Sequence, residues 1–494
     1  MKKITAIFVM AFAILSAAAA LPQPDLIARI YFAGAAKISS APNVSAFTNE
    51  FCSPEALALR KQTADKLAPW LAGWLQTHLG TSVPDGAAWL RPLLDDLQSS
   101  EWLAESRAMA GGPPEVALAI RLDAQRMAAW QAGLKPFFPA AKFSVTGGWL
   151  IFDSGTGGSK LGAALAQEIS VPQKSWFSLD VNWPHLAQWF PELGKLELPE
   201  TQFTVIPLEH NFLINGKFFF LQPPALNLEP WQFPTNLVNQ PFVSLTAVRG
   251  FASWLRTQDW LQPYQVTPAP NQVFIWAMQG IPYQTYLAEP VPDAAGALDQ
   301  TYQRLQPLFS PTGRFNQGIH SYSIQKTNNE ISMVDMPMFA PFIQAVKGPS
   351  GQYLFAGGFP IPGQNNPLPP QMSQQLAIPK LVLYHWESTS ARVPDILQFS
   401  QLALWFTDHV ELDGNSAAFK WLEHLAPTLG DTVTEITVAA PDQMVFKRSA
   451  PGVFTSAELF VLANWLEARN FPGCDLREPT LTGHRKHPHP QVPR

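Results

Sequence analysis

Cysteine and charge are both scarce in this chain of 494 residues. It has two cysteines, Cys52 and Cys474, which cannot form a zinc site by themselves. Charged residues make up 14% of the chain, against about 25% in typical soluble proteins, and the net charge is -5. A mildly acidic chain without long basic runs is a poor nucleic-acid ligand, because that binding depends on neutralising phosphates. We therefore exclude nucleic acid as a partner.

Long apolar runs are missing after the first twenty residues. Lys2 and Lys3 precede the apolar stretch ITAIFVMAFAIL and the small residues SAAAA, an order typical of secretory signal peptides. We expect residues 1–20 to be a signal peptide cleaved after Ala20, and the mature protein to be periplasmic or extracellular. No later apolar run reaches roughly 18 residues, so we expect no transmembrane span after cleavage. The alternative is an uncleaved membrane anchor.

Complete catalytic motifs are also missing. The chain has no Gly-x-Ser-x-Gly nucleophile elbow and no His-Glu-x-x-His zinc motif. Gly158-Ser159-Lys160 resembles the end of a phosphate-binding loop, but its lysine is displaced and no hydroxyl residue follows it. We therefore expect no cofactor and no metal site.

One short stretch resembles the active-site loop of the aspartic peptidases, namely Phe152-Asp153-Ser154-Gly155-Thr156. That chemistry needs two such loops, because two carboxylates share one proton. The stretch that aligns with it later in the chain is LFAGG, with Ala356 in the place of the aspartate. Only a homodimer would bring two copies of Asp153 together, which leaves Asp153 as the single catalytic candidate. We favour the interpretation that the glycines after it make a turn between a strand and a helix.

A pattern of an apolar strand followed by an aromatic helical stretch recurs along the chain. Such internal repetition indicates a fold built from related units. Six copies in order predict two halves of three units each: 25–38, 115–134 and 175–190, then 241–255, 272–309 and 380–399.

Two further pairs of segments recur in the same order. Residues 143–155 align with 347–358, and residues 202–224 align with 433–452. Within the second pair, Asn215-Gly216 is a strong hairpin signal and Pro441-Asp442 a weaker one. These correspondences predict an internal duplication.

The predicted fold class is α+β, with two related halves that each carry an antiparallel or mixed sheet and covering helices. The first half spans residues 21–224 and includes a helical insertion at 53–110. Ser53, Pro54 and Glu55 predict the start of a helix within that insertion. A Pro-rich linker at 225–240 leads to a second half at 241–470, and a basic, His- and Pro-rich tail at 471–494 is expected to be disordered.

The two cysteines bear on how the halves are connected. In an oxidising compartment, Cys52 and Cys474 can form one disulfide between the first helical region and the C-terminal edge. Two unrelated buried thiols are the alternative.

In overall pattern, the signal-like start, the repeated strand-helix units with tryptophans and the Gly-Trp-Leu hairpin resemble uncharacterised secreted proteins of planctomycete and verrucomicrobial bacteria. That resemblance implies a domain of unknown function and supplies no catalytic residues.

The sequence favours binding over chemistry. The chain has seventeen tryptophans, and seven of them lie in or beside apolar periodic runs, which is typical of a core, although a minority can line a groove. We expect a non-catalytic binding protein of the cell envelope or extracellular space, with an unknown apolar ligand or a protein segment as partner. The alternatives are a homodimeric aspartic peptidase that uses Asp153 and a structural assembly subunit.

Overall fold

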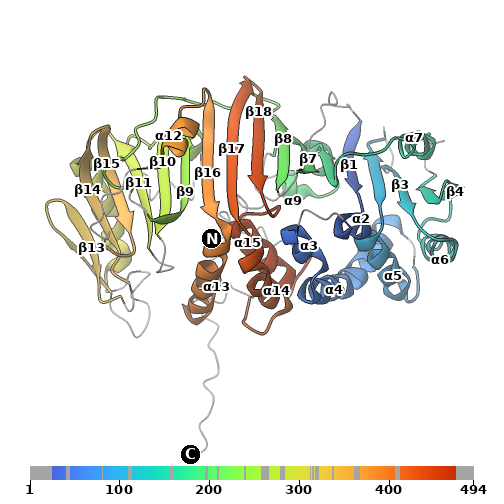
Figure 1. Ribbon diagram of the computed structural model, residues 1–494. Coiled ribbons are helices and arrows are strands. Elements are labelled where there is room, and N and C mark those ends of the chain that lie inside the picture. Colours follow the sequence, from blue (N-terminus) through green and yellow to red (C-terminus); the bar gives the residue numbers. More distant parts are fainter. Residues whose placement is uncertain are drawn as a thin grey trace, which may run out of the picture.

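The fold is known from a computed structural model, shown in Figure 1. The structure describes residues 25–40, 45–80, 82–109, 114–155, 160–194, 198–208, 211–238, 241–257, 266–278, 284–311, 313, 316, 322–336, 339–360, 368–406 and 412–473. The expected signal peptide at 1–20 and most of the expected tail at 471–494 lie outside these residues.

The described strands form one continuous sheet in which every pairing is antiparallel. Across the sheet the strands are β4 (Lys142–Thr146), β5 (Trp149–Asp153), β3 (Glu115–Arg121), β2 (Trp102–Arg107), β1 (Leu26–Phe32), β6 (Phe177–Val181), β7 (Glu200–Pro207), β8 (Phe212–Phe219), β18 (Gln443–Ala450), β17 (Asp431–Ala440), β16 (Leu381–Ser388), β9 (Phe242–Arg249), β10 (Gln272–Met278), β11 (Thr285–Val291), β15 (Gly351–Gly357), β14 (Phe342–Gly348), β13 (Glu330–Val334) and β12 (Ser323–Lys326). The expected combination of helices with an antiparallel sheet is confirmed. The strands of the two predicted halves share this one sheet instead of forming two.

The strand order is the same on both sides of the central pair β8 and β18. Outward from β8 follow β7, β6, β1, β2, β3, β5 and β4. Outward from β18 follow β17, β16, β9, β10, β11, β15 and β14. The eight strands of each series can be numbered from 1 to 8 in chain order, so that β8 and β18 are both strand 8. Both series then run 8, 7, 6, 1, 2, 3, 5, 4 outward from the centre of the sheet. The second side then continues with one additional hairpin, β12–β13.

Most of the helices lie along one side of the sheet, which we call the helical face (Figure 1). There α4 packs against α5 and α14, and α13 packs against α15. The helices are α2 (Ala35–Ser39), α3 (Ser45–Cys52), α4 (Pro54–Leu79), α5 (Gly86–Ser99), α6 (Ala124–Leu134), α7 (Leu161–Glu168), α8 (Trp183–Leu186), α9 (Pro191–Gly194), α10 (Ala252–Arg256), α11 (Ala294–Leu305), η3 (Gln306–Phe309), α12 (Pro370–Leu376), α13 (Thr389–Phe406), α14 (Ala417–Leu425), η5 (Ala426–Thr428) and α15 (Ser456–Glu467).

The opposite side, which we call the upper face, is covered by different segments. Helix α7 packs on β3 and β5 near one end of the sheet. Toward the other end, Trp231 and Phe233 of the predicted linker 225–240 pack against the core around Phe274 and Trp276. The linker is therefore part of the core, because its aromatic residues fill the upper face of the second side.

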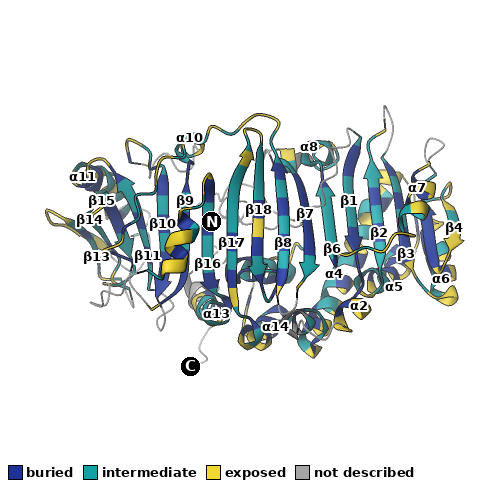
Figure 2. Cartoon of the chain, turned by 45° about the horizontal axis from the view of Figure 1, so that its top comes forward, coloured by how far each residue is buried: buried dark blue, intermediate teal, exposed yellow. Residues whose placement is uncertain are grey.

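Side chains alternate between the two faces along each strand, as the period of two requires. Strand β8 alternates between buried and half-buried residues over its whole length, and Figure 2 shows these alternating bands. In β1, Tyr31 points to the upper face, toward the segment that follows α7, and the adjacent Phe32 points to the helical face, toward α4. In β2, Leu103 lies opposite Tyr31 and therefore points to the upper face. Trp102 lies opposite Phe32 and therefore points to the helical face.

One predicted turn is wrong. Asn215 and Gly216 lie inside β8, and this strand pairs antiparallel with β7 along its whole length, so they do not form the turn of the hairpin. A Cβ added at Gly216 would lie 2.1 Å from the ring of Phe203 on β7, so this glycine makes room for an aromatic side chain. The Pro441-Asp442 turn is confirmed between β17 and β18.

The helical insertion predicted at 53–110 is helical only as far as Ser99, apart from the connection between α4 and α5. Residues Trp102–Arg107 form β2, which pairs with β1 and β3 inside the sheet. Alternate residues of β2 are buried, but the strand is short and follows a long helical pattern, which concealed its period of two. The predicted helix start is confirmed, because the Ser53 side chain accepts a hydrogen bond from the Ala56 amide at 3.1 Å.

Candidate functional site

An apolar cavity of about 370 Å³ lies between the sheet and the helices of the helical face. We call it the interlayer pocket. Its sheet side comes from β1, β2 and β6, and its helical side comes from α3, α4, α5, α14 and the region of α15. The lining residues are Phe32, Glu50, Phe51, Ala56, Leu59, Arg60, Thr63, Leu97, Gln98, Trp102, Phe177, Trp421, Phe454, Leu462 and Leu466.

One small residue of α4 helps to explain why this space stays open. Ala56 lines the pocket from the first turn of this helix. A helix that presents alanine to aromatic residues of a sheet leaves a gap unless another side chain fills it.

Helix α15 lines one side of the pocket and is attached at both ends. At its start, the Thr455 side chain and the Glu458 side chain form a capping box. Glu458 also receives two hydrogen bonds from Arg448 on β18, at 2.7 and 2.8 Å, and both residues are only 4% exposed. At its end, Gln62 of α4 donates to the Glu467 carboxylate at 2.7 Å. The wall formed by α15 is therefore fixed to the sheet and to α4.

Glu50 is the most unusual group in the pocket lining. It is 3% exposed, and its Oε2 accepts one long hydrogen bond from the Val453 amide at 3.4 Å. Its Oε1 has no hydrogen-bond partner among the described residues. Burial raises the pKa of Glu50 to about 8, so the carboxyl group is largely protonated at neutral pH.

The other charged group in the lining, Arg60, is held by local partners. Its guanidinium donates to the backbone oxygens of Phe51 and Gln98 and to the Gln98 side chain. Burial lowers its pKa. These bonds hold the Arg60 guanidinium against the pocket wall. The rest of the lining consists mainly of aromatic and aliphatic side chains.

Asp153, the catalytic candidate of the sequence, lies at the end of β5 and is 6% exposed. Its two oxygens accept hydrogen bonds from the amides of Gly155 at 2.9 Å and Gly162 at 3.1 Å. Nearby, Glu115 accepts from the Leu161 amide at 3.2 Å. Two carboxylates thus bind the first amides of α7, where the helix dipole favours negative charge. This geometry supports a structural role for Asp153.

The loop after Asp153 turns as expected at Gly155, which has a φ of 74°. A Cβ at that position would lie 2.2 Å from the Ala140 carbonyl oxygen, so only glycine fits. In the corresponding hairpin β14–β15, Ala356 faces Ile343 and Leu287 across the sheet. No second carboxylate stands there.

Only one end of the predicted disulfide can be placed. Cys52 is half-buried at the end of α3 and forms no disulfide with a described residue. Cys474 lies outside the described residues, so the Cys52–Cys474 pairing stays a prediction.

A row of polar side chains on the helical face was not predicted from the sequence. In this row Glu387 is buried, and Thr246 and His385 are half-buried. His385 Nδ1 lies 2.8 Å from the Thr246 hydroxyl, and His385 Nε2 lies 3.4 Å from Glu387. Glu387 also accepts from the Ser456 amide and hydroxyl, at 2.6 and 2.7 Å. Burial alone would raise the pKa of Glu387, but the neighbouring His385 and the hydrogen bonds from Ser456 lower it to about 2.

This row combines a hydroxyl, an imidazole and a carboxylate, as the catalytic triads of many hydrolases do. Its carboxylate, however, is bonded to the first residue of α15, so the row joins β16 to that helix. The sequence does contain one sign of this row. His385 and Glu387 are two residues apart in a strand, so their side chains lie on the same face of the sheet.

In comparisons with known proteins, no protein-family model, no curated protein and no solved structure matches this chain. Among the described residues, no group of three or more His, Cys, Asp or Glu side chains is placed to hold a metal ion. No helix in the described part of the chain combines the length and the hydrophobicity that a membrane crossing requires.

Proposed function

We propose that the protein is an exported, non-catalytic binding protein that holds an apolar ligand in the interlayer pocket. The observation that carries this proposal is the cavity of about 370 Å³ walled by aromatic and aliphatic side chains. Pockets for small ligands span roughly 300–1,000 Å³ and are lined mainly by such residues. Export is expected from the signal-like residues 1–20.

The energetics favour an apolar occupant. Each Å² of apolar surface removed from water stabilises the bound state by roughly 25 cal/mol. A polar ligand would lose hydrogen bonds to water and find few replacements, because the Arg60 guanidinium is already bonded to Phe51 and Gln98 and the Glu50 carboxyl group is the one lining group with an oxygen that lacks a partner among the described residues. An alkyl chain or a similar apolar group meets no such cost.

We further propose that the chain arose by duplication of an eight-strand unit. Support comes from the strand order, which is identical outward from β8 and from β18. The pocket uses both copies, since Phe32 and Trp102 come from the first and Trp421 and Leu462 from the second. A ligand there would bridge the two halves.

The experiment compares binding of decanol to the mature protein and to two variants by the shift in thermal midpoint. A ligand that binds the folded state raises the midpoint by mass action. Leu462→Trp enlarges a side chain in the pocket wall and should abolish the shift. Leu57→Trp makes the same substitution on α4 at a position that is 51% exposed, and should leave the shift unchanged.

The same experiment separates the alternatives. If decanol stabilises neither the parent nor the Leu57→Trp variant, the proposed function is wrong. In that case, a reproducible complex with one envelope protein that Leu462→Trp abolishes would identify a protein segment as the occupant. The homodimeric peptidase is not supported by the geometry of Asp153, whose oxygens bind the backbone amides of Gly155 and Gly162.

A further inference from the structure

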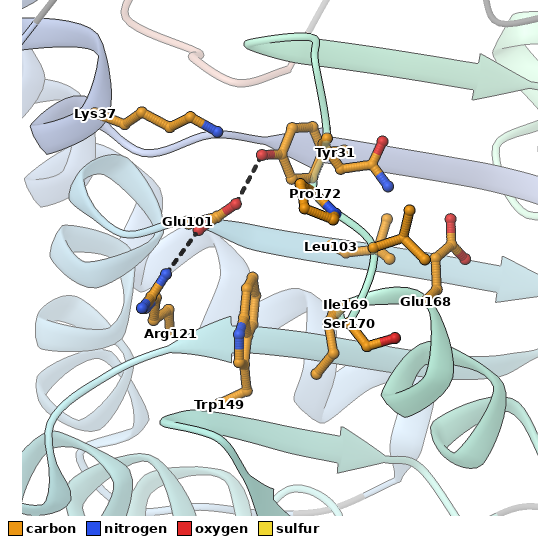
Figure 3. A pocket seen from close by; sticks show the side chains of 12 residues that line it. Tyr31, Lys37, Glu101, Leu103, Arg121, Trp149, Glu168, Ile169, Ser170 and Pro172 are labelled. Atoms are coloured by element: carbon orange, nitrogen blue, oxygen red, sulfur yellow. Dashed lines mark hydrogen bonds and ion pairs between the residues drawn. The ribbon is translucent and has the colours of Figure 1, made fainter.

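A second cavity, of about 310 Å³, opens on the upper face above β1, β2, β3 and β5. We call it the upper pocket. Figure 3 shows Tyr31, Leu103 and Trp149 along the strands, with Lys37, Glu101 and Arg121 beside them. The opposite rim is the segment from Glu168 to Gln173 that follows α7.

Polar side chains at one side of this pocket are prearranged. The Tyr31 hydroxyl donates to Glu101 Oε1 at 2.8 Å, and Arg121 Nη1 lies 3.5 Å from Glu101 Oε2. Burial is the main cause that raises the pKa of Tyr31, so this hydroxyl stays neutral. The Arg121 side chain is 64% exposed, which leaves most of its donors available to a ligand.

Lys37 supplies a further donor. It lies in the last turn of α2, and its ammonium has no hydrogen-bond or ion-pair partner among the described residues. On the opposite rim, Glu168 forms an ion pair with Arg29, so its charge is already balanced. The pocket therefore offers two cationic donors and one carboxylate acceptor near an apolar wall of Trp149, Leu103 and Ile169.

We propose that the upper pocket binds a sugar ring. A polyhydroxylated ring carries both donors and acceptors, so it can donate to Glu101 while it accepts from Lys37 and Arg121. Its C–H face can pack against the Trp149 indole. An acyl chain would desolvate three charged side chains without compensation. A simple anion would face the Glu101 carboxylate. This site is distinct from the interlayer pocket and does not depend on the function proposed for it.

The test is saturation-transfer NMR on the mature chain with four methyl glycosides: glucoside, galactoside, mannoside and N-acetylglucosaminide. At least one should bind. Arg121→Gln should weaken that binding about tenfold, the size of one lost charge-assisted hydrogen bond. Lys37→Gln should weaken it in the same direction. Both residues are exposed, so these variants are expected to fold.

Lys142→Gln is the matched control, because Lys142 is an exposed lysine on β4 that does not line the pocket. It should bind the glycoside as tightly as the parent. The proposal is overturned if none of the four glycosides binds, or if Arg121→Gln binds as well as the parent. It is also overturned if sulfate displaces the glycoside, since that result identifies a site for anions.

Discussion

The two pockets lie on opposite faces of the same pair of strands, β1 and β2. Tyr31 and Leu103 line the upper pocket, whereas their neighbours Phe32 and Trp102 line the interlayer pocket. The alternation of side chains along a strand thus gives two adjacent residues to two different cavities. One short strand pair supports one cavity with a charged side and one that is almost entirely apolar.

The difference in chemistry follows from what covers each face. The upper pocket takes its walls from residues 31–173, and its polar groups are partly open to water. The interlayer pocket takes part of its apolar lining from α14 and the region of α15, which come from the other end of the chain. The chemistry of each pocket therefore follows from the side chains of the elements that cover that face of the sheet.

The largest effect is expected from Arg448→Met, which breaks the buried ion pair between β18 and α15. Removing one partner of a buried pair leaves the other charge uncompensated and costs about 3–5 kcal/mol of unfolding free energy. Urea unfolding measures this loss. Decanol binding should weaken as the α15 wall loosens, while glycoside binding above the sheet should persist. A loss below about 1 kcal/mol would contradict the assigned role of the pair.

The next effect concerns Glu50 and depends on pH. The pKa of Glu50 is about 8 in the folded state, against an ordinary value of 4.5. Between these values the folded state keeps a proton that the unfolded state has released, so stability falls as pH rises from about 4.5 to about 8. Glu50→Gln removes this dependence and should gain about 2–4 kcal/mol relative to the parent across that window.

Unfolding curves of the parent and of Glu50→Gln at pH 5 and pH 8 check this prediction. Glu423→Gln, at an exposed glutamate of α14, should show no such pH-dependent gain. An equal difference between parent and Glu50→Gln at both pH values would mean that the Glu50 carboxyl group is not protonated in the folded state.

The smallest of the three effects is expected from Asp153→Ala. The buried amide of Gly162 and the half-buried amide of Gly155 lose their acceptor, which costs about 1–3 kcal/mol. Because α7 leads into the rim at Glu168–Gln173, glycoside affinity should fall, whereas decanol binding should not change. The measurement includes an acid-pH peptidase assay of the parent. Cleavage by the parent that Asp153→Ala abolishes, with the fold intact, would favour the peptidase alternative.

The sequence predicted the class of fold better than its details. The hairpin at 143–155 and the start of α4 follow from local signals, namely a Gly-Gly turn and a Ser-Pro-Glu cap, and local signals are what a sequence displays. Asn215-Gly216 misled because Gly216 makes room for Phe203 of the neighbouring strand, a contact that local sequence does not reveal. The same limit concealed β2 inside a helical stretch.

The candidate sites were less predictable still. Asp153 stood out because its neighbours resemble a catalytic loop, yet its partners are amides of Gly155 and Gly162. The interlayer pocket combines Phe32, Trp102 and Trp421, which lie far apart in the chain and meet only after the sheet has formed. No spacing rule joins residues at such distances. The high content of aromatic residues was the one sequence feature that suggested a groove.

The most direct test of the central claim is a crystal structure of the mature protein soaked with 1-bromodecane, with the bromine located by its anomalous signal. We predict a bromine site or continuous ligand density in the interlayer pocket, between Trp102 of β2 and Leu462 of α15. The signal should be absent from Leu462→Trp crystals. An empty interlayer pocket, or bromine found only on the upper face, would contradict the claim that this protein binds apolar ligands between its sheet and its helices.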